Sequence, residues 1–241
     1  YRQYTASIHW TTLSKAGDLS APTCNNCHGN HGAAPPGVTS VANVCGQCHS
    51  VQADNLEHSP HAAIFQALGS PGCATCHENH EIHPATDQML GPSPPAVCAT
   101  CHDPSDAGGK TAATMRALID QLRSAQQRAL AILQQAERAG MEVSQPQFDL
   151  NGANEALIKA RAAVHTFDAG AIRTPVDEGL AIARRAYERG VQALEELHFR
   201  RDGLAVSLVI IVLVIVGVVL KIRQIERRPG GGPKWRSIEE P

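Results

Sequence analysis

The segment Cys24-Asn-Asn-Cys27-His28 decides how the first 109 residues are organised, because three later segments repeat its form. They are Cys45-Gly-Gln-Cys48-His49, Cys73-Ala-Thr-Cys76-His77 and Cys98-Ala-Thr-Cys101-His102. In each segment two residues separate the cysteines, and a histidine directly follows the second cysteine. These segments hold all eight cysteines of the chain. One pattern kept four times indicates one kind of chemical site, built four times.

The CxxCH pattern is typical of covalent haem c attachment. Two thiols add to the vinyl groups of the haem, and the adjoining histidine becomes the proximal ligand of the iron. The sequence therefore predicts four covalently bound haem c groups. The attaching cysteines are Cys24, Cys27, Cys45, Cys48, Cys73, Cys76, Cys98 and Cys101, and the proximal ligands are His28, His49, His77 and His102.

Zinc binding and structural disulfides are the two alternatives for these cysteines. The spacing from Cys24 to Cys48 also fits a zinc ribbon, and four disulfides could form in an oxidising compartment. Neither explains a histidine after every second cysteine. Histidine makes up 12 of 241 residues, so four such matches would arise by chance roughly once in a hundred thousand. Haem c is the interpretation that accounts for the whole motif.

The first 109 residues, called the head below, read as one unit written twice. Each unit contains a Ser-x-His segment, then CxxCHxxH, then Val-CxxCH. Four haems need four ligands on their distal faces, and both units supply extra histidines in matching places. The predicted distal ligands, which would give four low-spin haems with two histidines each, are His9, His31, His61 and His80.

Four other residues are alternatives for distal ligation. His58 and His83 occur in the second unit only. His165 lies in an expected helix after the head, where it either reaches across to a haem or packs between helices. Met89 is the fourth alternative, and a methionine ligand would raise the potential of its haem.

The doubled CxxCH motifs, with the Ser-x-His and CxxCHxxH segments around them, resemble the multihaem c-type cytochromes. In style they are similar to the tetrahaem quinol-dehydrogenase subunits of the NapC/NrfH type. The resemblance covers residues 1–103 and implies haem attachment and electron transfer beside a membrane. In NapC/NrfH-type proteins the membrane anchor precedes the haems, whereas in this chain the apolar segment follows them.

The head is acidic and poor in hydrocarbon side chains. It has two basic residues, Arg2 and Lys15, against eight acidic ones, whereas residues 110–241 have 19 basic and 15 acidic residues. Nucleic acid is not an expected partner, because phosphate binding needs clustered Lys and Arg. Only 13 of residues 11–103 are Leu, Ile, Val or Phe, which is too few for an ordinary core. A large, flat, apolar cofactor would supply one.

Residues 110–201, called the neck below, carry apolar side chains at helical spacing. Helices are expected over 115–136, 153–167 and 175–198, with a turn over 168–174 before Pro175. Three amphipathic helices predict an antiparallel bundle or a coiled coil.

Residues 203–220 are an uninterrupted run of 18 uncharged, mostly apolar residues, about the length that spans a bilayer. Basic residues dominate the segment that follows, which predicts a cytoplasmic tail. Haem c is attached outside the cytoplasm, so the head is expected on the opposite side. The third neck helix is expected to continue into the span as one rod.

The expected fold class is therefore mainly α: a haem-packed, loop-rich tetrahaem head, a helical bundle or neck, and one transmembrane helix. The chain divides into 1–109 for the head, 110–201 for the neck, 202–222 for the transmembrane helix and 223–241 for a basic cytoplasmic tail. The expected location is the cytoplasmic membrane, with a single pass, the head on the periplasmic or extracytoplasmic side and the C-terminus in the cytoplasm.

The expected function is electron relay between a membrane complex of the quinol or cytochrome b type and extracytoplasmic acceptors. The chain would be a subunit of a respiratory or photosynthetic electron-transfer complex, in contact with lipid through one helix. An acidic head also favours a basic soluble redox protein as a partner, because opposite charge steers encounter.

Two other function classes stay open. The enzymatic alternative is a multihaem reductase of nitrite or hydroxylamine, which needs a haem with a vacant position. The other is an assembly scaffold in which the neck is the working part. No catalytic side chain is expected.

Overall fold

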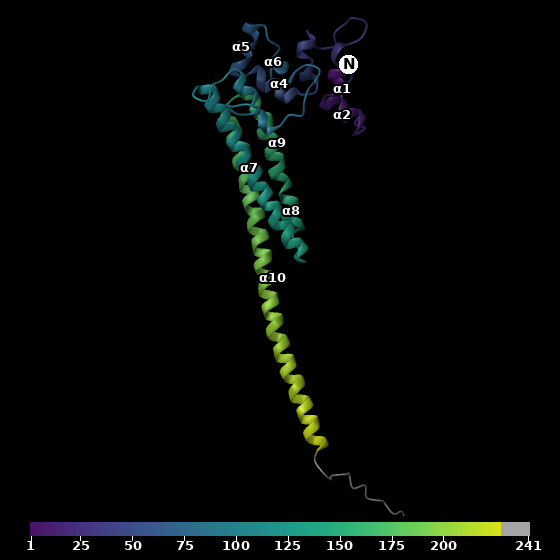
Figure 1. The fold of residues 1–241 in the computed structure, drawn as a ribbon, viewed down its shortest axis with the longest axis vertical. Helices are drawn as coiled ribbons and strands as arrows, with labels where there is room; N and C mark the ends of the chain where they lie inside the picture. Colours follow the sequence, from purple (N-terminus) through teal and green to yellow (C-terminus); the bar gives the residue numbers. More distant parts are fainter. Residues whose placement is uncertain (228–241) are drawn as a thin grey trace, which may run out of the picture.

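The computed structural model describes residues 1–227, and these are helical apart from turns and loops, with no β-strand among them. The head lies at one end of an elongated molecule, and a long helix runs from it to the other end (Figure 1). The head contains short helices joined by loops: α1 (Arg2–Thr5), α2 (Ile8–Ser14), α3 (Cys24–His28), η1 (Val41–Gln47), α4 (Ser50–Glu57), α5 (Pro60–Leu68), α6 (Gly72–His77), η2 (Asp87–Met89) and η3 (Val97–Thr100).

Five further elements follow the head along the chain. Helix α7 is long, α8 and α9 are short, a single 3-10 turn follows α9, and α10 is much the longest. Their bounds are α7 (Ala107–Arg138), α8 (Ser144–Asp149), α9 (Asn151–Ala163), η4 (Val164–Thr166) and α10 (Ala169–Glu226). In Figure 1, α7, α8 and α9 lie beside the upper part of α10, and the lower part of α10 continues alone.

The hydrophobic core lies in the neck and not in the head. Of the buried hydrophobic side chains in residues 1–227, the head contributes only Ala21 and Ala96. The neck has two clusters, one above the other along the helices. The cluster nearer the head comprises Met115, Leu118, Ile119, Leu122, Ala156, Leu157, Ala160, Ile172 and Val176. The second comprises Ala129, Leu133, Ala136, Val143, Leu150, Ala153, Ala183 and Ala186.

Helix α7 begins at a side-chain cap, where Asp106 Oδ1 accepts a hydrogen bond from the Gly109 backbone N–H at 2.7 Å. Its buried residues recur every three or four positions, which places one apolar stripe against the rest of the neck. The apolar periodicity predicted this helix correctly. It did not predict that Gly108 and Gly109 lie inside the first turn, because glycine is a poor helix former and reads as a break.

Two glycines bring α10 close to α7. A Cβ atom at Gly179 would lie 2.7 Å from Leu122 Cδ1, and one at Gly190 would lie 2.7 Å from Ile132 Cγ2. Larger side chains at these positions would force the two helices apart. The close contact lets Leu122 become completely buried, as expected where side chains interdigitate at high density.

The start of α10 differs from the sequence-based expectation. A turn was expected over 168–174, but the helix begins at Ala169, where Asp168 Oδ1 accepts a hydrogen bond from the Gly170 N–H at 2.8 Å. Pro175 is therefore inside the helix and not in its first turn. Ile172 and Val176 are completely buried, and their burial against the first cluster holds the helix through the proline.

The far part of α10 could cross a membrane once, by its length and composition, and its apolar side chains are exposed. The expectation that neck helix and apolar span form one rod is met, because α10 has no interruption between them. Of the expected tail over 223–241, only residues up to 227 lie among those that the structure describes; residues 228–241 lie outside them.

Truncation of a core residue should separate buried from exposed positions on α7. We expect Leu122→Ala to lower the free energy of unfolding by about 3 kcal/mol, since Leu122 is completely buried between α7 and α10. The matched control is Leu130→Ala on the same helix, whose side chain is 43% exposed and which should cost less than about 1 kcal/mol. Urea unfolding of the detergent-solubilised full-length protein, followed by far-UV circular dichroism, measures both. Equal losses would contradict the packing described here.

Candidate functional site

The Ser-x-His segments place one histidine in the first turn of a helix. Ser7 Oγ accepts a hydrogen bond from the Trp10 N–H at 3.1 Å and caps α2, which carries His9. Ser59 Oγ accepts one from the His61 N–H at 3.2 Å and caps α5. Serine is a favoured N-cap residue, and both of these serines are buried. The repeated motif is therefore a helix start that fixes the direction of the histidine.

The four CxxCH segments fold in two ways that alternate along the chain. The first motif of each unit is itself a short helix, α3 or α6, which ends on His28 or His77. In the second motif of each unit the histidine N–H donates to the carbonyl of the first cysteine at 2.9 Å, His49 to Cys45 and His102 to Cys98. The duplication seen in the sequence is thus a duplication of local structure.

Each CxxCH histidine faces a second histidine. The ring centroids are 5.7 Å apart for His28 and His80, 6.4 Å for His49 and His9, 6.1 Å for His77 and His165, and 5.9 Å for His102 and His61. The ring planes of the first three pairs are inclined to each other by only 16°, 26° and 23°, whereas those of His61 and His102 are inclined by 79°. In the first pair the two Nε2 atoms are 3.4 Å apart.

These separations fit one metal ion held between two imidazoles. A metal–imidazole bond is about 2 Å long, so two rings on opposite sides of one ion have nitrogens roughly 4 Å and centroids roughly 6 Å apart. Groups of three or more His, Cys, Asp or Glu that could hold a bare ion do not occur among residues 1–227. Two facing ligands suit a metal whose other four ligands come from a macrocycle, with a pair of cysteines beside it. The side chains present therefore fit haem c.

The structure brings together most of the predicted distal histidines, with one exchange. His9, His61 and His80 each face a CxxCH histidine, and His165, one of the alternates, faces His77. His31 faces none of them: it is exposed, at a φ of 55°. We therefore place His165, and not His31, opposite His77.

The remaining alternates have other surroundings. His58 Nδ1 lies 2.8 Å from the Asp54 carbonyl oxygen, and its side chain is exposed. His83 Nε2 lies 3.8 Å from a carboxylate oxygen of Glu81. Met89 meets the fourth motif through its backbone, because its carbonyl accepts a hydrogen bond from the Cys98 thiol.

The pairs join segments that are far apart in the sequence. His80 of the second unit faces His28 of the first, 52 residues away. His165 of the neck faces His77 of the second unit. The second unit thus supplies the histidine that faces His28 of the first unit, and the neck supplies the histidine that faces His77 of the second unit.

Burial lowers the pKa of three of the paired histidines. The pKa values of His9, His61 and His77 fall below the ordinary histidine value, first through desolvation and then through the neighbouring imidazole of the same pair. Both causes favour the neutral ring, which is the form that binds a metal ion.

Neighbouring motifs lie next to one another in chain order. After burial, charge on Cys45 raises the pKa of the Cys27 thiol, and charge on Cys98 raises that of Cys76. The Cys45 and Cys73 thiols also interact across the junction of the two units, which lowers the pKa of Cys45 and raises that of Cys73. Contacts of η1 with α3 and with α6 place the first three motifs side by side, and the fourth lies near the third; this succession of neighbouring motifs is called the row below.

The turn after α9 contributes side chains to two of the four histidine pairs. It carries His165, and two residues later Phe167 lies over the His61 ring with centroids 3.9 Å apart. Asn55 of α4 donates a hydrogen bond to the Ala162 carbonyl at 3.0 Å and ties this turn to the head. Phe167 and Asn55 had no signal in the sequence, because neither belongs to a motif.

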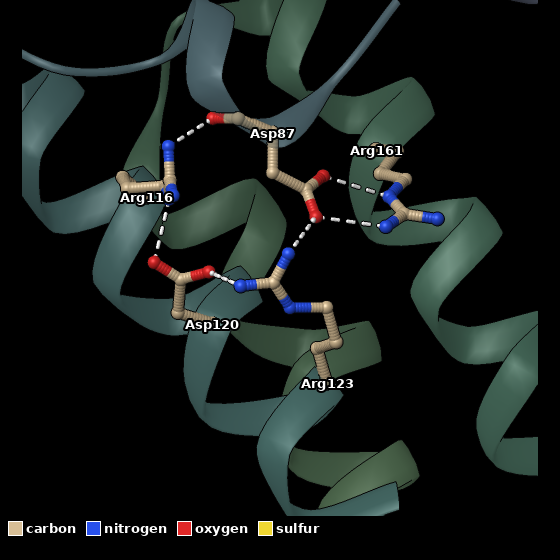
Figure 2. Close-up of polar contacts among 5 residues, drawn as sticks. All are labelled: Asp87, Arg116, Asp120, Arg123 and Arg161. Atoms are coloured by element: carbon tan, nitrogen blue, oxygen red, sulfur yellow. Dashed lines mark hydrogen bonds and ion pairs between the residues drawn. The ribbon is translucent and has the colours of Figure 1, made fainter. Parts of the chain in front are cut away.

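A buried carboxylate fastens the head to the neck (Figure 2). The Asp87 side chain is 6% exposed and accepts two hydrogen bonds from Arg161 of α9, each 2.8 Å long. Arg123 of α7 approaches the same carboxylate at 3.3 Å, and Arg116 donates to the Asp87 carbonyl. Asp120 pairs with both Arg116 and Arg123 and keeps them in place. One head residue is thus held by two neck helices.

Gly108 leaves room for the histidine of the fourth motif. A Cβ atom at this position would lie 2.1 Å from His102 Nδ1, which is far inside van der Waals contact. The first turn of α7 therefore packs directly against a paired histidine. The sequence offered a signal, a Gly-Gly pair six residues after the last motif, but it read more simply as a break.

Comparison with known proteins supports the repeat. A family model described as "Doubled CXXCH motif" matches residues 17–54 and 66–107, which contain the first and second pairs of motifs. The match covers about a third of the chain. The motifs indicate covalent haem c binding, and the match supports a multihaem c-type cytochrome-like protein involved in electron transfer. No curated protein and no solved structure matches the chain.

Removal of the Asp87 charge should loosen the head from the neck. Asp87→Asn keeps the shape of the side chain but loses its ionic contacts. We therefore expect the free energy of opening of the turn at η2 to fall by about 2 kcal/mol at pH 7. Hydrogen exchange of the Met89 and Leu90 amides, which bond to Thr86 and Asp87 carbonyls, measures this opening. Glu188→Gln, in the exposed pair with Arg184, is the control and should change it by less than about 0.5 kcal/mol.

The effect of Asp87→Asn should depend on pH. Hydrogen bonds from Arg161, and then the charges of the surrounding arginines, lower the pKa of Asp87 despite its burial. The ionised Asp87 carboxylate therefore contributes its full stabilisation above the unfolded-state pKa, about 3.9. This stabilisation is lost as the pH falls through the lower folded-state pKa. Wild type and variant should converge only at a pH below the lowered folded-state pKa of Asp87. A difference that persists unchanged into acid would show that the Asp87 charge is not responsible.

Proposed function

We propose that this chain is a membrane-anchored tetrahaem c-type cytochrome that relays electrons between a membrane complex and extracytoplasmic acceptors. The observation that supports it best is the set of four facing histidine pairs, one for each CxxCH motif. This set of pairs accounts for the attachment of haem, the ligation of its iron and the number of haems, since each site has two cysteines and two histidines.

In the proposed sites two facing histidines would hold the haem iron between them. His28, His49, His77 and His102 are the proximal ligands, and they are paired with His80, His9, His165 and His61 in that order. Haem supplies the one-electron change between ferric and ferrous iron. The side chains would orient it, exclude water from its faces and leave no coordination position for a substrate. Such a site exchanges electrons without binding a substrate.

The row of adjacent motifs supports a relay rather than four separate centres. Each attachment site lies beside the next, and the contact between Cys45 and Cys73 links the two units. An electron that enters at one end could pass along the row. The head also lacks a side-chain core, and four macrocycles packed between its loops would fill that space.

The reductase alternative gains no support from this arrangement. A nitrite or hydroxylamine reductase needs one haem with a vacant position, whereas no CxxCH histidine in the described chain lacks a facing partner. We therefore propose an electron-transfer subunit without a substrate site of its own.

The apolar end of α10 is the proposed membrane anchor. The head would lie on the periplasmic or extracytoplasmic side, where haem c is attached, with the C-terminus in the cytoplasm. The proposed partners are a quinol-oxidising or cytochrome b-type complex of a respiratory or photosynthetic chain and, for the acidic head, a basic soluble redox protein. NapC/NrfH-type subunits offer a parallel in haem attachment and membrane anchorage, and the reversed order of anchor and haems sets this chain apart from their direct oxidation of quinol.

Substitution of two histidines distinguishes the proposed ligands. We expect His165→Ala to make one of four haems high-spin, because it removes the ring that faces His77. The matched control is His31→Ala, which should leave all four low-spin, since His31 faces no CxxCH histidine. Electron paramagnetic resonance and carbon monoxide binding to the reduced protein measure both. A high-spin haem in the His31 variant would show that this assignment is wrong.

The haem number has a direct test. Denatured wild-type protein should retain four covalent haems by intact mass, one for each cysteine pair, and the native reduced protein should bind almost no carbon monoxide. Three or fewer haems in matured protein would contradict the tetrahaem proposal. Ready binding of carbon monoxide by the native protein would instead support the reductase.

A further inference from the structure

Helix α10 is one continuous rod from the haem sites to the far end of the described chain (Figure 1). It starts four residues after His165, and its apolar run begins only at Gly203. About 34 residues, 169–202, therefore separate the head from the proposed membrane span. At a rise of 1.5 Å per residue this segment is about 50 Å long.

The neck keeps most of this segment straight. Ile172 and Val176 belong to the first core cluster and Ala183 and Ala186 to the second, with Leu194 packed against the second cluster from below. Only residues 195–202, roughly 12 Å of helix, lie between this packed part and the apolar run. In that short stretch Glu196 and Arg200 form an ion pair one turn apart, which supports the exposed helix.

The head is also fixed at the top of the rod. Asp87 joins it to α7 and α9, and Asn55 joins it to the turn that carries His165. The spacer therefore has no free hinge at the head, and at its other end it continues into the apolar run as the same helix. A membrane helix tilts by about 20° on average and rarely beyond about 40°, so the head stays roughly 40–50 Å above the bilayer surface.

We propose that the neck is a spacer that sets the height of the haem row, so that electrons are exchanged with a protein whose own redox centre stands at that height. This inference rests on the proposed membrane anchorage and relay function. The partner is a membrane complex with its redox centre in a domain that projects roughly 40–50 Å from the bilayer. Quinol dissolved in the bilayer is not the direct donor.

The physical reason is the steep distance dependence of electron tunnelling, whose rate falls exponentially with the separation of donor and acceptor. Helix α10 offers no route of its own, because the described residues below the head include no CxxCH motif. Each transfer moves one electron: the partner's centre is oxidised as one ferric haem is reduced. That exchange has to take place at the head.

A reductant held at a known height tests the spacer. The full-length protein is placed in lipid vesicles with viologen attached to a lipid headgroup through flexible linkers of increasing length. Each viologen radical cation gives one electron to one ferric haem and becomes the dication, so four equivalents reduce one chain. Reduction is followed by haem absorbance in a stopped-flow instrument, at vesicle concentrations low enough to suppress transfer between vesicles.

We expect short-linker viologen to reduce the haems at least 100-fold more slowly than linkers that reach roughly 40–50 Å. Detergent should remove the difference, because viologen on other micelles can then meet the head. A rate that does not depend on linker length, whether fast or slow throughout, would overturn the spacer.

Free viologen in the same vesicles tests the tetrahaem relay separately from the spacer. It should reduce all outward-facing chains by four electrons each, and the short-linker result is judged against that amplitude. Failure of free viologen to deliver four electrons would overturn the tetrahaem relay itself. Full reduction by free viologen and by the shortest linker alike would leave the relay intact and refute only the spacer.

Discussion

The head has almost no hydrocarbon core, so its shape depends on four histidine pairs and the group that fits between them. Ala21 and Ala96 are its only buried hydrophobic side chains among the described residues, which is too little burial to offset the entropy of ordering so many loops. Rings held about 6 Å apart leave the width of one metal ion between them. In the proposed holoprotein each haem acts as a covalent crosslink and as core at once, and this explains why loop-rich sequence suffices around the motifs.

The pairs also explain why the two units and the neck form one body. The first motif of unit one is faced by His80 of unit two, and the first motif of unit two is faced by His165 of the neck. The neck therefore takes the place that a third unit would have beside the second. It closes the repeat in the way that a capping element closes a repeat array. His31, the counterpart of His80 in the first unit, has no preceding unit to face within residues 1–227.

The positions of the neck helices are decided by packing and by one buried charge. Gly179 and Gly190 allow α10 to approach α7 closely, and the resulting core keeps α10 helical through Pro175. Asp87 then binds three arginines of α7 and α9, so a buried charge is fully paired, as it must be to avoid a large desolvation cost. The same contacts that stabilise the neck also orient His165 and Phe167 toward the haem sites.

The sequence by itself determined the four CxxCH motifs, the duplicated units, the neck helices and the apolar run, because each is encoded within a few neighbouring residues. Only the tertiary structure decided that His80 faces His28 and that His165, not His31, faces His77. A distal ligand needs only to reach the iron in space, and segments far apart along the chain can do so; spacing carries no record of that choice. The same holds for the Asp87 contacts and for the start of α10, where burial of Ile172 outweighed the turn signal of Pro175. Local patterns specify local structure, whereas partners across the fold are selected by packing.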